Sequence, residues 1–229
     1  MKTVLKSAAL LLGYFTFANV ASAADAYVDP GYNWTGFYAG VDAGFRDLNA
    51  DVSLPALALS DASPSLNDFS LGGELGYRHQ LDNNVVLGIS AEAAWLQGDH
   101  DADQLTGFPA AFWNAHSDWS ASVQGSLGYA FDRAMIYGMG GVAFTDISGC
   151  GTIGVAGPCS INTQFSGTHT GWTVGAGLAY ALTDNWSTNI EYHYANYGSE
   201  TYTTIGSVGG VTKVDLDSHA VTAGIQYRF

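Results

Sequence analysis

Residues 221–229 read VTAGIQYRF, with apolar or aromatic side chains at the odd positions and small or polar ones at the even positions. Successive side chains of a β-strand point to opposite faces of the sheet, so this alternation predicts a strand with one apolar and one polar face. The predicted strand ends with an aromatic residue, Phe229.

Seven further segments repeat this alternation, and each has about the nine to eleven residues that a tilted strand needs to cross a bilayer. These segments are residues 37–46, 71–81, 85–95, 119–131, 134–146, 172–182 and 186–194. Together with residues 221–229 they make eight predicted strands.

The facing of residues 134–146 is the least clear, because the odd positions Met135, Tyr137 and Met139 compete with the even positions Ile136 and Val142. Hairpin register favours the odd set as the apolar face, since apolar residues four apart flank each tight turn. The flanking pairs are Leu81 with Val85, Phe131 with Met135, and Leu182 with Trp186.

A strand–turn–strand–loop unit recurs along the chain. Gly-x-Leu-Gly-Tyr occurs at residues 73–77 and 125–129, with a variant at 176–180, and each copy precedes a tight turn rich in Asp and Asn. These residues tolerate the left-handed conformations that short hairpins require. The turns cover residues 82–84, 132–134 and 183–185, whereas four longer polar loops lie near 47–68, 98–117, 147–170 and 198–217.

Short turns at one end, long loops at the other and an even strand count are typical of a transmembrane barrel. We therefore predict an all-β protein, an eight-stranded antiparallel up-and-down transmembrane β-barrel. A soluble β-sandwich or lipocalin-like barrel is the alternative. Its outward strand faces would carry many charges, whereas the polar faces here are dominated by Gly, Ser, Thr and Gln.

Aromatic residues gather at the ends of the predicted strands, where interfacial girdles of membrane barrels lie. They are Trp34, Tyr77, Trp95, Trp119, Tyr129, Trp172, Tyr180 and Trp186. Their placement favours a membrane barrel over a soluble β protein.

The N-terminus has the pattern of a secretory signal peptide. Lys2 and Lys6 form a basic region, residues 8–20 are mostly apolar, and residues 21–23 read Ala-Ser-Ala, the small-x-small pattern of a cleavage site. We predict a signal peptide over residues 1–23 cleaved after Ala23, a short periplasmic linker over 24–33 and the barrel over 34–229. Sec export to the outer membrane of a Gram-negative cell follows from these features.

The predicted mature chain is strongly acidic. All 21 acidic residues follow Ala23 and only five of the seven Lys and Arg do, so the predicted mature chain carries −16 with His neutral. This charge argues against a nucleic-acid partner, whose phosphates need a basic face. Cys150 and Cys159 are the two cysteines, and in an exported protein we predict that they form a disulfide.

The opening segment Asn33-Trp-Thr-Gly-Phe-Tyr-Ala-Gly40 resembles the outer-membrane β-barrel family of outer immunogenic proteins, also labelled porin-family proteins, within the OmpA-like eight-stranded superfamily. The likeness continues through residues 140–143, through Glu-Tyr-His-Tyr at 191–194 and through Tyr-Arg-Phe at 227–229. The resemblance implies a role in outer-membrane architecture and surface exposure. It also implies that Phe229 belongs to the signal read by the barrel-assembly machinery, which would be a partner along with outer-membrane lipid.

An eight-stranded barrel is only wide enough for its own side chains to fill it. Charged residues on the predicted inward faces would therefore form a lumen charge network of acids and arginines, because buried charges persist when they are paired and hydrogen-bonded. The network is Asp42, Arg46, Glu74, Arg78, Glu92, Glu191 and Arg228. A structural network that plugs the lumen is the favoured interpretation; a narrow, gated ion path that uses the same charges is the alternative, and the sequence alone does not exclude it.

The sequence gives only weak evidence for catalytic or metal-binding groups. His193 with Glu191, Asn196 and Ser199 suggests a lipid hydrolase, but a triad needs its members within hydrogen-bond reach, and Ser199 lies beyond the predicted strand. The acidic run Asp-His-Asp-x-Asp at 99–103 lacks the Gly and distal Glu of a calcium loop. We expect no catalytic residue, no metal site and no cofactor.

Two functions remain. The first is a structural and surface protein that contributes to envelope integrity and presents acidic extracellular loops, for which the sequence names no ligand. The second is a small-solute porin or narrow channel. A lipid-modifying enzyme of the outer membrane is a more distant third, because motifs such as Gly-x-Ser-x-Gly and His-Glu-x-x-His are missing from the sequence.

Overall fold

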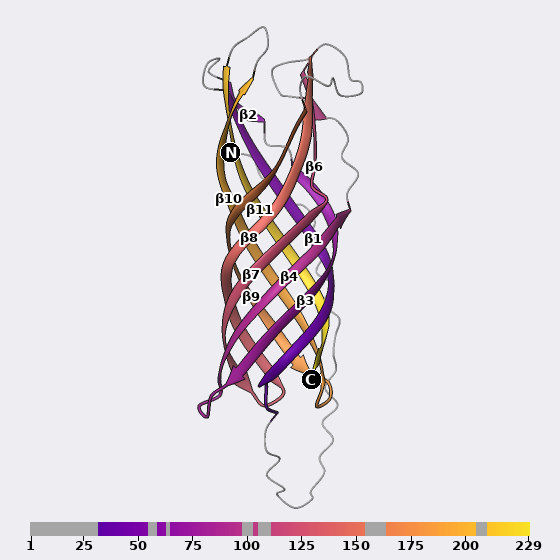
Figure 1. The fold of residues 1–229 in the computed structure, drawn as a ribbon, viewed down its shortest axis with the longest axis vertical. Helices are drawn as coiled ribbons and strands as arrows, with labels where there is room; N and C mark the ends of the chain where they lie inside the picture. Colours follow the sequence, from indigo (N-terminus) through magenta and orange to yellow (C-terminus); the bar gives the residue numbers. More distant parts are fainter. Residues whose placement is uncertain are drawn as a thin grey trace, which may run out of the picture. The chain divides into compact units, whose positions relative to one another are not determined.

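Eight long β-strands make up the computed structural model, which describes residues 32–54, 59–62, 65–97, 103–104, 111–153, 164–204 and 210–229 (Figure 1). They are β1 (Gly36–Leu54), β3 (Ser65–Gln80), β4 (Val85–Gln97), β7 (Trp119–Phe131), β8 (Ala134–Ile153), β9 (Gln164–Ala181), β10 (Trp186–Thr204) and β11 (Gly210–Arg228). There are three short strands among the described residues. β2 (Leu59–Ala62) pairs with the extension of β1, β6 (Ala111–His116) pairs with the extension of β8, and β5 (Asp103–Gln104) pairs with β6.

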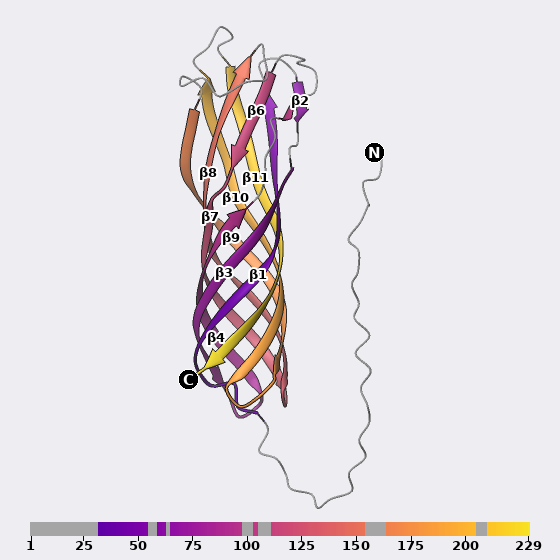
Figure 2. The ribbon, with the colours of Figure 1, turned by 90° about the vertical axis from the view of Figure 1, so that its right-hand side faces the viewer.

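The long strands close into a barrel in which every pairing is antiparallel. Each strand pairs with its neighbour in the chain, β8 pairs with β9, and the first strand β1 pairs with the last strand β11. The prediction of an eight-stranded antiparallel up-and-down barrel is confirmed (Figure 2). No helix in the described part of the chain is long and apolar enough to cross a membrane.

Three predictions concern residues outside the described ranges. The signal peptide with its cleavage after Ala23 and most of the linker over 24–33 fall there. So does Cys159, one half of the predicted disulfide, while Cys150 lies in β8. All three stay predictions.

The outer face of the barrel is apolar and the inner face is polar, the reverse of a soluble barrel. Phe37, Val41 and Phe45, at odd positions of β1, have 60–71% of their surface exposed, whereas Tyr38 and Arg46, at even positions, are buried. The same pattern recurs on every long strand. Such an outer surface is stable where lipid, not water, surrounds it.

Short turns join β3 to β4, β7 to β8 and β9 to β10, and we call this end of the barrel the turn end and the opposite end the loop end. Two turns have the predicted flanking pairs: Leu81 N donates to Val85 O at 2.8 Å, and Leu182 N donates to Trp186 O at 2.8 Å. The third is tighter, because Phe131 pairs directly with Ala134. Asp132 adopts the left-handed conformation there, with φ of 57°.

The prediction that the odd positions of residues 134–146 form the apolar outer face is wrong. Met135 and Tyr137 are buried in the lumen, whereas Ile136 and Val142 are exposed on the outer face. The cause is the two-residue turn at Asp132, which is one residue shorter than the other two. A register change of one residue moves every side chain of a strand to the opposite face.

Aromatic belts surround the outer face near both ends. Ring pairs at the turn end are Phe37–Tyr77 at 4.8 Å and Trp186–Tyr227 at 5.0 Å; ring pairs at the loop end are Phe45–Phe69 at 5.7 Å and Trp172–Tyr194 at 5.5 Å. Trp34, predicted in a belt, instead lies inside the barrel with 2% exposure.

The facing of β8 can be tested with nitroxide labels on single cysteines. We expect a label at Ile136 to collide readily with dissolved oxygen in a bilayer, because this side chain points outward. A label at Met135 should be shielded inside the lumen. Power-saturation spectroscopy measures both accessibilities, and a higher oxygen accessibility at 135 than at 136 would restore the odd-face assignment.

Candidate functional site in the barrel lumen

An apolar cluster fills the lumen at the turn end. Its members come from four strands, β4, β7, β8 and β9, and from the segment that precedes β1. They are Tyr32, Trp34, Val86, Ala130, Met135, Tyr137, Ala179 and Ala181, with Met139 packed against them. Apolar side chains at this end exclude water from the mouth of the lumen.

Trp34 is fixed in the mouth by hydrogen bonds from two directions. Its backbone N–H donates to Gln80 Oε1 at 2.8 Å, and its indole N–H donates to the Asp132 carbonyl at 3.3 Å. The backbone N–H of Tyr32 donates to Asp132 Oδ1 at 3.2 Å, and the Arg228 guanidinium lies 4.6 Å from the Tyr32 ring. The segment before β1 is therefore part of the lumen filling.

A first polar group lies next to this cluster and centres on Arg78. Its Nη1 donates to Gln226 Oε1 at 2.9 Å, and Gln226 Nε2 donates to Glu74 Oε2 at 2.8 Å. Tyr38 Oη donates to Glu74 Oε1 at 2.7 Å. The guanidinium also stacks 4.0 Å from the Tyr38 ring, a cation–π arrangement that stabilises a buried cation.

A second polar group centres on Glu191. Its Oε1 accepts hydrogen bonds from Tyr137 Oη and, at 2.8 Å, from Asn189 Nδ2. Its Oε2 lies 2.9 Å from His193 Nε2. Three side chains thus satisfy one carboxylate that is 9% exposed, as a buried charge requires.

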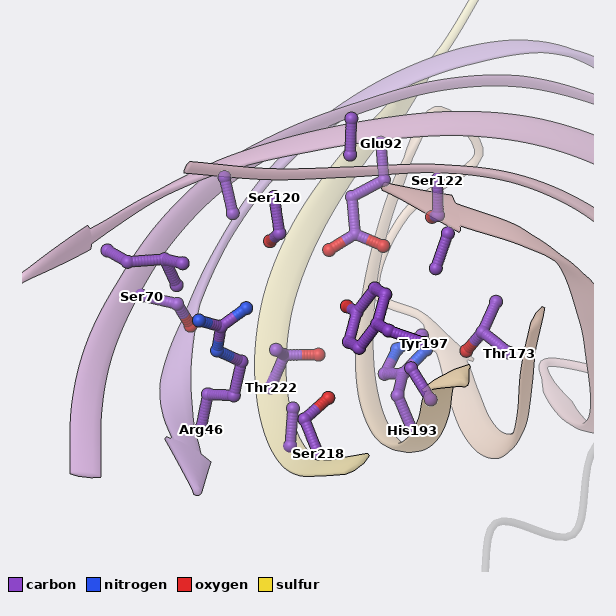
Figure 3. Close-up of a pocket in the computed structure, with 16 residues that line it drawn as sticks. Arg46, Ser70, Glu92, Ser120, Ser122, Thr173, His193, Tyr197, Ser218 and Thr222 are labelled. Carbon is purple, nitrogen blue, oxygen red and sulfur yellow. The ribbon is translucent and has the colours of Figure 1, made fainter. Parts of the chain in front are cut away.

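A cavity opens beyond these groups, toward the loop end. Arg46, Glu92 and His193 point into it from different sides (Figure 3), and hydroxyls of serine and threonine line much of the remaining wall. It offers about 70 Å³ of space for the centres of water molecules. Because roughly 10–15 Å³ of such space suffices for one water, the cavity has room for several.

Arg46 lies on the cavity wall beside a second apolar layer, of which Ala143, Ala195 and Tyr197 also line the cavity. Its Nη2 lies 3.4 Å from Asp68 Oδ2, and its Nη1 donates to Thr145 Oγ1 at 3.3 Å. The apolar layer covers the cavity on the loop side and consists of Leu48, Ala143, Ile147, Ala195, Tyr197 and Leu216. Apolar side chains are therefore packed on both sides of the Arg78 and Glu191 groups.

The structure places the residues of the predicted charge network in several separate groups. It places Glu74 with Arg78 in the first polar group, Glu191 in the second, and Arg46 and Glu92 on the cavity. Asp42 also faces the lumen, beside Gly72. Arg228 lies at the turn end, where its Nη2 donates to the Asp184 carbonyl at 2.6 Å, and not with the other charges.

Sequence reasoning missed several members. Asp68 fell inside a predicted loop because β3 begins earlier than the alternation suggested. Tyr38, Tyr137 and Gln226 stood on predicted strands but carry no charge, so a charge-based selection passed over them. A rule that polar aromatic residues on an inward face seek a partner would have found Tyr38, but not Tyr137, which the sequence placed on the outer face.

The proposed hydrolase triad is not assembled. His193 faces the lumen beside Glu191, whereas Ser199 is exposed and donates a hydrogen bond to Asp215. A bulge between Asn196 and Gly198, where φ reaches 78°, separates the two positions. Among the described residues no group of three or more His, Cys, Asp or Glu is placed to hold a metal ion; residues 99–101 of the acidic run fall outside these ranges.

Comparison with known proteins gives a consistent result. A family model described as an outer membrane protein beta-barrel domain matches residues 7–229. The 31 kDa outer-membrane immunogenic protein of Brucella melitensis biotype 1 is 31% identical over 245 residues, covering 93% of this chain and 95% of that protein. The 22 kDa outer membrane protein of Rhizobium leguminosarum bv. viciae is 26% identical over 90% of this chain and 83% of that protein.

Among solved structures, the outer membrane protein OprG from Pseudomonas aeruginosa aligns with a TM-score of 0.49 and 14% identity. The alignment covers 87% of this chain and 98% of that one.

Removal of the Glu191 carboxylate should strongly destabilise the folded barrel. Glu191→Ala should lower the free energy of unfolding by about 3–5 kcal/mol, because it leaves His193, Tyr137 and Asn189 buried without their shared acceptor. Tyr137→Phe should cost about 1 kcal/mol, the value of one hydrogen bond. Urea unfolding of the refolded barrel in lipid vesicles measures both.

The matched control is Asp82→Ala, on an exposed turn, which should change stability by no more than about 0.5 kcal/mol. A Glu191→Ala loss as small as that of the control would show that the buried carboxylate does not organise its neighbours.

Proposed function

The chain belongs to the outer membrane protein beta-barrel domain family, and from this premise we propose that it is a structural and surface protein of that membrane. It spans the cell outer membrane with eight strands and contributes to envelope integrity. Its acidic loops lie on the outside of the cell. Short turns of such barrels face the periplasm, which assigns the turn end to that side.

One observation carries the proposal: packed side chains occupy the lumen on both sides of its central cavity. From the turn end outward it holds the apolar cluster around Trp34, the Arg78 and Glu191 groups, and the apolar layer around Leu48. A pore needs a continuous aqueous path, and these layers interrupt one. A barrel whose interior is packed serves as a rigid anchor for its loops.

The names of the relatives support surface exposure. The 31 kDa protein of Brucella melitensis and the 25 kDa protein of Brucella abortus are both described as outer-membrane immunogenic proteins. Neither name states a catalytic activity. For this chain we propose the corresponding role of a surface-exposed protein without enzymatic function.

The cavity favours a second candidate, a narrow channel. Arg46, Glu92 and His193 surround a space with room for water in the middle of the barrel. An ion path would result if the apolar layers on either side moved apart. This candidate needs a rearrangement of packed side chains, so we rank it second.

Planar-bilayer recording separates the two candidates. We expect refolded protein to give no steady, reproducible conductance steps, because packed side chains block the lumen. Insertion must be verified in the same bilayers, for example by protease protection of the strands. Reproducible single-channel steps from the inserted wild-type chain would replace the structural role by the channel.

We also propose that Phe229 is read by the barrel-assembly machinery, as the family resemblance implies. Its ring is 76% exposed on the outer face, 5.3 Å from the Tyr227 ring, while its backbone N–H donates to Phe37 O at 3.0 Å. The backbone of this residue completes the β1–β11 seam. Its side chain is left free for recognition.

Phe229→Ala should slow assembly in cells without changing the folded barrel. The expected result is accumulation of unfolded protein in the periplasm, seen as a smaller heat-shifted fraction on SDS gels, with Phe229→Tyr assembling normally. Stability of refolded Phe229→Ala should match that of wild type within about 1 kcal/mol, because an exposed side chain is lost. Normal assembly of the alanine variant would remove the assignment.

A further inference from the structure

The outer face of β9, β10 and β11 carries an unusual patch at the loop-end aromatic belt. We call it the β9–β11 patch and define it as Trp172, Tyr192, Tyr194, Asp217 and His219. The side chains toward the turn end, such as Val174 and Val221, are apolar. The next outward position toward the loop end of β9 is Thr170, so the patch lies where the apolar surface gives way to a polar one.

The rings of the patch contact one another across three strands. Tyr194 lies 5.5 Å from Trp172 and 5.1 Å from His219, and Tyr192 lies 6.1 Å from His219. Tyr194 pairs in register with His219, which fixes this contact through the backbone. The three strands therefore present a continuous aromatic surface to the membrane interface.

A carboxylate lies within this surface. His219 Nδ1 lies 2.6 Å from Tyr192 Oη, and His219 Nε2 lies 3.5 Å from Asp217 Oδ2. The His219 ring thus lies between the Tyr192 hydroxyl and the Asp217 carboxylate.

A second carboxylate adjoins the patch. Asp47 on β1 is the register partner of His219, and its Oδ1 is buried without a hydrogen-bond partner among the described residues. One lysine, Lys213, lies on β11 itself, four positions from Asp217 toward the loop end. The four arginines lie elsewhere: Arg46 and Arg78 in the lumen, and Arg133 and Arg228 at the turn end.

Aromatic faces beside carboxylates match one chemical class of ligand. Ring faces attract cations, quaternary ammonium groups in particular, and carboxylates pair with amines. A headgroup without a cation, such as that of phosphatidylglycerol, would bring an uncompensated phosphate charge to these carboxylates. Bridging by a divalent ion is disfavoured, because the described residues offer no group of three or more acids, histidines or cysteines in a metal-holding arrangement.

We propose that the β9–β11 patch is a binding site for a membrane lipid whose headgroup carries a cationic amine. The headgroup lies over the Tyr194 and Trp172 rings with its amine toward Asp217, and its acyl chains follow the apolar surface toward the turn end. The proposal goes beyond the structural role, and it holds whether or not the lumen conducts.

Native mass spectrometry of the refolded barrel tests the site directly. The protein is offered equal amounts of phosphatidylcholine, phosphatidylethanolamine and phosphatidylglycerol with identical acyl chains. We expect the two amine-bearing lipids to be retained at least about threefold more than phosphatidylglycerol, the effect of one exposed cation–π contact. Asp217→Asn and Tyr194→Leu should abolish the preference, whereas Tyr194→Phe should keep it.

The chain supplies matched controls at the turn end. Trp186→Leu removes a belt tryptophan and Asp184→Asn removes an exposed acid, both far from the patch, and neither should alter lipid selectivity. Each variant is first shown to fold by its heat-dependent shift on SDS gels. If Tyr194→Leu does not fold, Asp217→Asn and Trp172→Leu carry the test.

Three results would overturn the proposal. Equal retention of the three lipids would show that the aromatic surface binds acyl chains without regard to headgroup. Equal loss in the patch variants and the turn-end controls would make the effect a general property of the belts. Retention that disappears with EDTA would assign the site to a phosphate bridged by a divalent ion.

Discussion

The requirement that every backbone N–H and C=O in an apolar environment be paired governs this structure. A strand wall surrounded by lipid has no water to satisfy an open edge, so the sheet must close on itself. Closure depends on the pairing of β1 with β11, the two strands most distant in sequence. The other features of the molecule follow from keeping that ladder continuous.

One consequence is that the inward side chains of the strands must fill the lumen themselves. Alternation assigns half of each strand to a narrow interior, where large and small residues have to complement each other. Gly76 lies against the Tyr38 ring, and a Cβ at this position would come within 2.5 Å of Tyr38 Oη. Gly177 stands in the same relation to Tyr137. These two glycines admit the tyrosines whose hydroxyls satisfy Glu74 and Glu191, so the small residues on the inward faces make the polar groups possible.

Period-two alternation was sufficient to predict the number of long strands, their antiparallel order and the inward position of Arg46, Glu74, Arg78 and Glu191. It failed where one residue decides the outcome: the shorter turn at Asp132 reversed the facing of β8. It also failed for Trp34, because burial of this side chain depends on Gln80 and on Asp132, about a hundred residues away. Partners such as Arg78 and Gln226 belong to strands that meet only after closure, and no local pattern encodes their register.

The segment Glu191-Tyr192-His193-Tyr194 shows how one short motif serves both faces of the wall. Glu191 and His193 point inward and hold a buried hydrogen-bonded group, while Tyr192 and Tyr194 point outward into the loop-end belt. Because alternate residues meet different environments, a substitution at an even position acts on the membrane surface, and one at an odd position acts on the lumen. Internal packing and the contacts made with lipid are thus encoded by interleaved residues of one strand. The two properties can be changed separately as long as the ladder that joins them stays closed.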